Sequence, residues 1–286
     1  MLRITRVHTP RINAAAQLRH RDHRQQRQQM LIDGRRELAL ALAAGIEVVE
    51  LFYDPQLLAS DPSHQALIAQ ARARGGTPIE VTPLVLQKLA YGQRCEGMVA
   101  VARMPQRTLG DLALPADALV AVVEGIEKPG NLGAILRTAD ATGVHAVIAA
   151  GAGTDLYNPN VIRASLGAVF TVPTCHAATP QVQAYLAEHG FRILTAQVAA
   201  AAAYWSADFR GRVAIVLGSE AQGLSAAWQH AAHQAIRLPM HGHVDSLNVS
   251  VTAAVLLYEA LRQRTGPAGV GESPASGVRR SSSGLA

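Results

Sequence analysis

The chain alternates short apolar runs with stretches of helical character, and this alternation most limits the folds open to it. Between residues 119 and 265 the expected strands are Leu119–Glu124, Ala146–Ala149, Phe170–Pro173, Arg192–Ala196, Val213–Leu217 and Ala235–Leu238, with helices between most of them. A smaller unit has expected strands at Glu47–Tyr53, Pro78–Val81 and Gly97–Ala102. Alternation of this kind predicts an α/β protein with largely parallel sheets.

The length of 286 residues is typical of about two domains. Residues 104–118 carry the Pro and Gly content of a linker, and the Gly, Ser and Pro of the last residues predict disorder. The expected segments are a basic N-terminal arm (1–30), a small α/β domain (31–103), the linker (104–118), a larger α/β domain (119–265) and a disordered tail (266–286).

The composition bears on membrane spans, disulfides and metal sites. The hydrophobic fraction is 49%, yet no apolar run approaches the ~18 residues that cross a bilayer. Cys95 and Cys175 are too few and too scattered for a disulfide framework or a zinc site, which favours a reducing, cytoplasmic setting. His241 and His243 have no third ligand nearby in the sequence, so no metal site is expected.

Positive charge is concentrated at the N-terminus. Residues 1–30 hold one acid, Asp22, against seven arginines, a formal charge of +6: Arg3, Arg6, Arg11, Arg19, Arg21, Arg24 and Arg27. Such a segment can bind nucleic-acid phosphates by releasing counterions. A disordered, solvated tail is the alternative interpretation.

The segment from Leu238 to Val251 places polar residues between a strand and an apolar helix. Ser246 suits the helix cap, where its oxygen can accept a backbone N–H. The residues Leu247, Val251, Ala254, Val255 and Tyr258 recur on one apolar face of that helix. This face leaves Asn248 available for something other than packing, although an ordinary capped connection fits the segment equally well.

A second polar loop follows the strand that ends at Glu124. Asn131 is well placed to cap the next helix, and Arg137 lies opposite that helix's apolar stripe and leans back over the loop. A lone arginine of this kind is usually a surface residue. The carboxyl end of a strand is, however, also where α/β sheets bind ligands.

A third loop follows the apolar strand Val213–Leu217. Gly218 permits close backbone approach, and Glu220 is either solvated or paired with a cation such as Arg137. Ser225 is a natural cap for the next helix. The patch from Asn158 to Phe170, with Arg163, is compatible with tight helix packing or with a substrate contact.

Taken together, these loops resemble the SpoU (TrmH-like) family of the SPOUT methyltransferase superfamily. The matching residues are Asn131-x-Gly133-x-x-x-Arg137-Thr, Leu217-Gly-Ser-Glu220-x-x-Gly223 and Leu238-Pro-Met…Ser246-Leu-Asn248-Val-Ser-Val251. The smaller unit resembles the L30e-like substrate-binding domain of some members. The chain is most similar to members that act on ribosomal RNA, including those that confer antibiotic resistance.

The resemblance implies a ribose 2′-O-methyltransferase of 23S ribosomal RNA that uses S-adenosylmethionine, with a deep trefoil knot and a homodimeric state. The implied catalytic and substrate residues are Asn131, Arg137, Glu220, Ser246 and Asn248. The implied cofactor residues are Thr195, Leu217, Gly218, Glu220, Gly223, Leu238, Met240, Ser246 and Leu247. The arginines of the arm and Arg163 are expected to bind RNA.

The chemistry of the transfer leaves the proton acceptor open. A ribose hydroxyl must lose its proton, yet a guanidinium is deprotonated only above about pH 12. We therefore expect Arg137 to clamp a phosphate and stabilise a developing alkoxide, with the proton going to that phosphate, to water or to Glu220. The alternative functions are a transfer-RNA 2′-O-methyltransferase and a non-catalytic RNA-binding, ribosome-associated protein.

Overall fold

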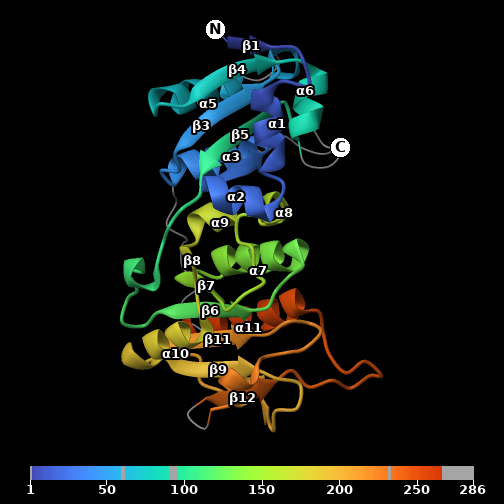
Figure 1. Ribbon diagram of the computed structural model, residues 1–286. Helices are drawn as coiled ribbons and strands as arrows, with labels where there is room; N and C mark the ends of the chain where they lie inside the picture. Colours follow the sequence, from blue (N-terminus) through green and yellow to red (C-terminus); the bar gives the residue numbers. More distant parts are fainter. Residues whose placement is uncertain (1, 59–61, 91–95, 231–232, 266–286) are drawn as a thin grey trace, which may run out of the picture.

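The computed structural model describes residues 2–58, 62–90, 96–230 and 233–265, so the tail of 266–286 and Cys95 lie outside the described residues. Two α/β domains are stacked on each other, the smaller one N-terminal (Figure 1). No helix in these ranges is long and apolar enough to cross a membrane.

The smaller domain is built on a five-stranded sheet of order β1-β4-β3-β5-β2. The strands are β1 (Leu2–Ile4), β2 (Gln29–Asp33), β3 (Val48–Tyr53), β4 (Thr77–Val81) and β5 (Met98–Arg103). The helices are α1 (Pro10–Gln17), α2 (Arg21–Arg27), α3 (Arg35–Ala43), α4 (Pro55–Leu58), α5 (Pro62–Ala73) and α6 (Pro83–Leu89). Because β5 runs antiparallel to both β2 and β3, this sheet is mixed rather than largely parallel.

The first 30 residues belong to this domain and do not form the separate arm expected from their charge. Strand β1 pairs with β4 along the edge of the sheet. Ile12, Ala15 and Leu18, on and just after α1, pack in the core beside Phe52 and Ile79. Apolar residues between the arginines therefore anchor the segment.

The larger domain is built on a seven-stranded sheet of order β10-β12-β9-β11-β6-β7-β8, in which every pairing is parallel. Its strands are β6 (Leu119–Glu124), β7 (Ala146–Ala150), β8 (Thr174–Ala177), β9 (Arg192–Ala196), β10 (Ala202–Ala203), β11 (Val213–Leu217) and β12 (Gln234–Arg237). The expected strand at Phe170–Pro173 is wrong, because a short helix occupies Ala168–Thr171 and the strand begins at Thr174.

Helices cover both faces of this sheet. The α-helices are α7 (Pro129–Ala141), α8 (Pro159–Ala164), α9 (Ala168–Thr171), α10 (Thr179–Glu188) and α11 (Val249–Thr265), and the 3₁₀ helices are η1 (Leu109–Asp111) in the linker, η2 (Tyr204–Ser206) and η3 (Ala226–Trp228). Alternate residues of β6 serve the two layers. Leu119, Ala121 and Val123 pack with α7 and α11, whereas Val120 and Val122 pack with α10.

Helices α8 and α9 lie between the two domains, against α7 on one side and the smaller domain on the other (Figure 1). The Arg24 guanidinium, 1% exposed, reaches across to Asp155 and also donates to the carbonyls of Leu18 and Arg19 at 2.8 and 2.7 Å. Arg163 pairs with Asp33 across the same joint at 3.3 Å. The joint therefore combines apolar packing with buried charge.

Candidate active site

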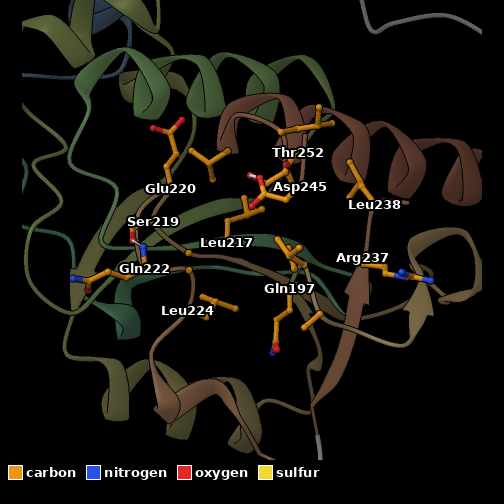
Figure 2. A pocket seen from close by; sticks show the side chains of 18 of the residues that line it. Gln197, Leu217, Ser219, Glu220, Gln222, Leu224, Arg237, Leu238, Asp245 and Thr252 are labelled. Carbon is orange, nitrogen blue, oxygen red and sulfur yellow. Dashed lines mark hydrogen bonds between the residues drawn. The ribbon is translucent and has the colours of Figure 1, made fainter. Parts of the chain in front are cut away.

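A cavity of about 820 Å³ opens at the carboxyl ends of β9, β11 and β12, beside the start of α11 (Figure 2). In a parallel sheet this edge is where loops from several strands converge on a ligand. Eight residues expected at the cofactor line it: Leu217, Gly218, Glu220, Gly223, Leu238, Met240, Ser246 and Leu247. Three segments far apart in the sequence thus share one cavity.

Thr195 is the expected cofactor residue that does not line the cavity. It is fully buried in β9, and its hydroxyl accepts a hydrogen bond from the Gln197 side chain at 3.0 Å. Gln197 itself lines the cavity, as do Asp245 and Thr252 (Figure 2). The sequence analysis missed these three residues, although the place of Gln197 just after a strand is a usable signal.

The loop of residues 218–224 folds back on itself. Ser219 and Gly223 exchange backbone hydrogen bonds of 3.1 and 2.9 Å, and Gly223 has φ +67°. A Cβ on Gly218 would lie 2.2 Å from the Gly223 carbonyl carbon. The close approach expected at Gly218 is therefore to the loop's own backbone, and this tight turn presents Glu220 (Figure 2).

The Glu220 carboxylate joins three elements of the domain. It accepts hydrogen bonds from Lys128 at 2.5 Å, Asn131 at 2.8 Å and Asn248 at 2.6 Å. Asn248 also donates to the Asn131 side chain at 3.1 Å. The structure thus brings together Asn131, Glu220 and Asn248, as expected, and adds Lys128, which the sequence analysis missed.

Electrostatics keep Glu220 ionised. The hydrogen bond from the Lys128 ammonium lowers the pKa of the Glu220 carboxyl below its usual value of 4.5, and Asn131 adds to the effect. The expected pairing of Glu220 with Arg137 is wrong, since Glu220 forms its ion pair with Lys128. Arg137 is exposed on α7, is not among the cavity-lining residues, and makes no hydrogen bond or ion pair with the described part of the chain.

The helix caps at the site differ from those expected. Asn248 caps α11, because its side-chain oxygen accepts from the Ser250 backbone N–H at 2.9 Å, whereas Ser246 donates to Asp245. Helix α7 begins at Pro129 with Lys128 in the cap position, which places Asn131 inside the first turn. Ser225 precedes η3 without a side-chain cap and contacts Glu124 instead.

The apolar face of α11 also differs from expectation. Leu247, Val251 and Tyr258, expected to pack, are 39%, 47% and 53% exposed. The buried residues of α11 are Val249, Ala253, Leu256, Leu257 and Ala260. The helix is therefore apolar on two faces, and among the residues that the structure describes only one of these faces is covered.

Several arginines expected to contact RNA have partners within the protein. Arg24 is buried at the domain joint and cannot reach a ligand there, and Arg163 pairs with Asp33. The others with internal partners are Arg11 with Glu50, Arg19 with the carbonyls of Lys88 and Ala90, Arg21 with the Gly153 carbonyl, and Arg27 with Ala14 and Gln17. Arg3 and Arg6 are exposed.

The residues that the structure describes contain no group of three or more His, Cys, Asp or Glu side chains able to hold a metal ion.

Comparison with protein families matches both domains. Residues 118–258 match the SpoU rRNA Methylase family, and residues 9–100 match the MRM3-like substrate binding domain. A 23S rRNA (uridine(2479)-2′-O)-methyltransferase of Streptomyces viridochromogenes is 31% identical over 268 residues, covering 87% of this chain and 88% of the relative. A 23S rRNA (guanosine-2′-O-)-methyltransferase of Bordetella pertussis is 37% identical over 211 residues, covering 72% and 86%.

Solved structures agree with the fold. A crystal structure of an RNA 2′-O ribose methyltransferase is 44% identical, with a TM-score of 0.78 over 92% of this chain and 99% of that one. The SpoU methyltransferase AviRb from Streptomyces viridochromogenes, in complex with AdoMet, is 28% identical, with a TM-score of 0.83 over 90% and 98%.

Proposed function

The chain belongs to the SpoU rRNA methylase family, and we propose on that ground that it methylates a ribose 2′-hydroxyl of 23S ribosomal RNA. The structural observation that supports this proposal is the hydrogen-bonded group of Glu220, Asn131 and Asn248 beside the cavity. Relatives named as acting on 23S rRNA disfavour both the transfer-RNA and the non-catalytic alternatives.

S-adenosylmethionine is the methyl donor, and the residues of the cavity suit it. A volume of about 820 Å³ lies within the usual range for small-molecule sites, roughly 300–1,000 Å³. Leu217, Leu238 and Leu247 supply apolar surface, while Asp245 and Gln197 supply polar groups. The bound cofactor would supply an activated methyl group on a sulfonium.

The protein's own part in the reaction is to bind and orient the nucleotide. The exposed Arg137 guanidinium can clamp an RNA phosphate and stabilise negative charge on the ribose oxygen. Glu220 already accepts three hydrogen bonds and stays ionised, so it holds α7 and α11 in place rather than taking the proton. The proton then passes to the RNA phosphate or to water.

We propose a homodimer in which the open face of α11 is covered. Leu247, Val251 and Tyr258 form the apolar stripe that the described residues leave exposed, and Val244 just before it is 62% exposed. Apolar surface of this kind marks interaction sites. Sedimentation equilibrium should give twice the 30.2 kDa chain mass. Val251→Glu should shift it to the monomer, and a monomeric wild type would contradict the proposal.

We also propose the trefoil knot that the family resemblance implies. After β9 the chain forms β10 at the edge of the sheet, crosses to β11 on the other side of β9, and crosses back to β12 between β9 and β10. It then continues into α11, which packs on α7 and β11. Pulling the ends of the domain apart in optical tweezers tests this proposal. A knotted chain extends to less than its full contour length, whereas an unknotted chain reaches it.

The direct test of function is to map 2′-O-methylated nucleotides in ribosomal RNA from cells with and without the protein, together with methyl transfer in vitro to each RNA class. We expect one ribose of 23S rRNA to be methylated only when the protein is present. We also propose that the enzyme works in the cytoplasm. Antibiotic susceptibility of the two strains tests a resistance role. Transfer to tRNA alone would contradict the proposal.

A further inference from the structure

Glu124, at the carboxyl end of β6, lies outside the cavity yet holds one end of the loop that forms it. Its Oε2 accepts from the Ser225 backbone N–H at 2.8 Å, and its Oε1 accepts from the Ser225 hydroxyl at 3.0 Å. The Thr179 hydroxyl, at the start of α10, donates to the same Oε1 at 3.0 Å. One carboxylate therefore ties β6, α10 and residue 225 together.

Ser225 directly follows the loop of residues 218–224, all of which line the cavity. The other end of this loop is fixed by β11, which is buried throughout. Past Ser225 the chain enters η3, where Trp228 is fully buried in the core. The loop is thus held at both ends, and at its distal end Glu124 supplies the polar anchor.

A second contact brings the same strand end against the loop. Gly125 follows Glu124 with φ +65°, and a Cβ placed there would lie 3.5 Å from the Ser219 Cβ. The end of β6 therefore approaches the loop near its first turn as well as at residue 225. Displacing the Glu124 side chain would release the loop at the end nearest η3.

We propose that Glu124 is a positioning residue that holds the loop of residues 218–224 in the conformation that binds S-adenosylmethionine. Glu124 has this role only if the cavity holds the cofactor, so the proposal rests on the proposed function. Glu220 belongs to the same loop, and its contacts with Lys128, Asn131 and Asn248 depend on the loop's position. Glu124 thereby affects cofactor binding and the alignment of the site.

The contacts require hydrogen-bonding geometry more than negative charge. In a Glu124→Gln variant the amide oxygen can accept from the Ser225 N–H, while the amide NH₂ donates to the two hydroxyls, which can act as acceptors. In Glu124→Ala all three contacts are lost. The Gln variant should therefore keep the loop in place, and the Ala variant should not.

The test is titration calorimetry of S-adenosylmethionine with the full-length protein. We expect Glu124→Ala to weaken binding about tenfold, which corresponds to about one net hydrogen bond at a partly exposed site, and Glu124→Gln to stay within about twofold of wild type. Asp111→Ala is the matched control, because Asp111 also accepts an N–H and an O–H, both from Thr108, but lies in the linker. It should leave affinity unchanged.

Two results would overturn the proposal: Glu124→Ala binding as tightly as wild type, or Glu124→Gln weakening binding as much as Glu124→Ala. If the Ala variant does not fold, Ser225→Ala and Thr179→Val each remove one hydroxyl donor, and each should weaken binding about two- to threefold. No loss in either variant would also overturn it. A wild-type protein that binds no S-adenosylmethionine would instead refute the proposed function.

Discussion

At the scale of single residues, Arg137 carries the most specific chemical expectation. A guanidinium presents two parallel donors to a phosphate, whereas an ammonium presents a point charge. Arg137→Lys should lower kcat roughly 100-fold, the size of the loss when one transition-state donor is removed. Cofactor affinity should not change, since Arg137 does not line the cavity. Methyl transfer and calorimetry measure the two, and near-wild-type turnover would argue against the clamp.

Glu220 should make cofactor binding sensitive to acid but not to mild changes of pH. Its pKa in the folded protein is lowered by Lys128, so its contacts are intact above the usual value of 4.5 and are lost as the pH falls through the lowered value. Lys128→Met should move that loss to higher pH. Carboxyl ¹³C chemical shifts followed from pH 7 to 3 would report both midpoints, and identical midpoints would contradict the assigned cause.

The sequence predicted which polar residues would meet but not every pairing. The family resemblance implied that Asn131, Glu220 and Asn248 share one site, and the structure gives the physical reason, since each follows a strand whose carboxyl end lies at the same edge of the sheet. Whether Lys128 or Arg137 pairs with Glu220 could not be predicted from the sequence. The two cations lie nine residues apart, about 14 Å along a helix, and only the path of the 218–224 loop decides which one Glu220 reaches.

At the scale of elements, the contact between α7 and α8 depends on a missing side chain. A Cβ on Gly133 would lie 2.4 Å from the Ala164 Cβ and 2.9 Å from the backbone at Ala164 and Ser165, where α8 ends. Gly133→Ala should therefore lower the free energy of unfolding by roughly 1–3 kcal/mol through overpacking.

Gly130 in the same helix is the matched control, because a Cβ there meets nothing within 4 Å. Gly130→Ala should be neutral or stabilising by up to about 1 kcal/mol, since alanine favours the helix. Urea unfolding monitored by circular dichroism measures both variants. Equal effects at the two positions would show that helix propensity, and not the contact with α8, governs Gly133.

Strands that are buried on both faces of the sheet could be predicted from the sequence. Short apolar runs could not be assigned to a strand or a helix. The strands Leu119–Glu124, Arg192–Ala196 and Val213–Leu217 match their expected bounds, since strands buried on both faces read as apolar runs. The run near Phe170 became helix α9, because a few apolar residues fit either structure. Periodicity also found an apolar face on α11 without indicating that a second face is the one that packs.

At the scale of the whole molecule, the buried ion pair at the joint should hold the two domains as one body. Arg24→Met removes the partner of Asp155 and the donor to two carbonyls, and should cost roughly 3 kcal/mol, the lower end for a broken buried pair. Arg11→Met breaks only a surface pair with Glu50 and should cost under about 1 kcal/mol. Urea unfolding compares them.

Arg24→Met should also affect RNA binding without affecting the cofactor site. In Arg24→Met the affinity for S-adenosylmethionine should be unchanged, because the cavity lies in the other domain, while KM for ribosomal RNA rises. Calorimetry and steady-state methylation measure the two. An unchanged KM would indicate that the smaller domain does not depend on the joint for RNA binding.

The strand order of the larger domain has a consequence for the chain during its synthesis. Strand β6 ends at Glu124, but its neighbour β11 begins only at Val213. At 5–20 residues per second a ribosome needs roughly 5 to 20 s to cover that interval. During this time one edge of a strand that is apolar from Leu119 to Val123 lacks its partner, a state that favours aggregation or chaperone binding. The larger domain therefore stays open to aggregation while the chain is still attached to the ribosome that makes it.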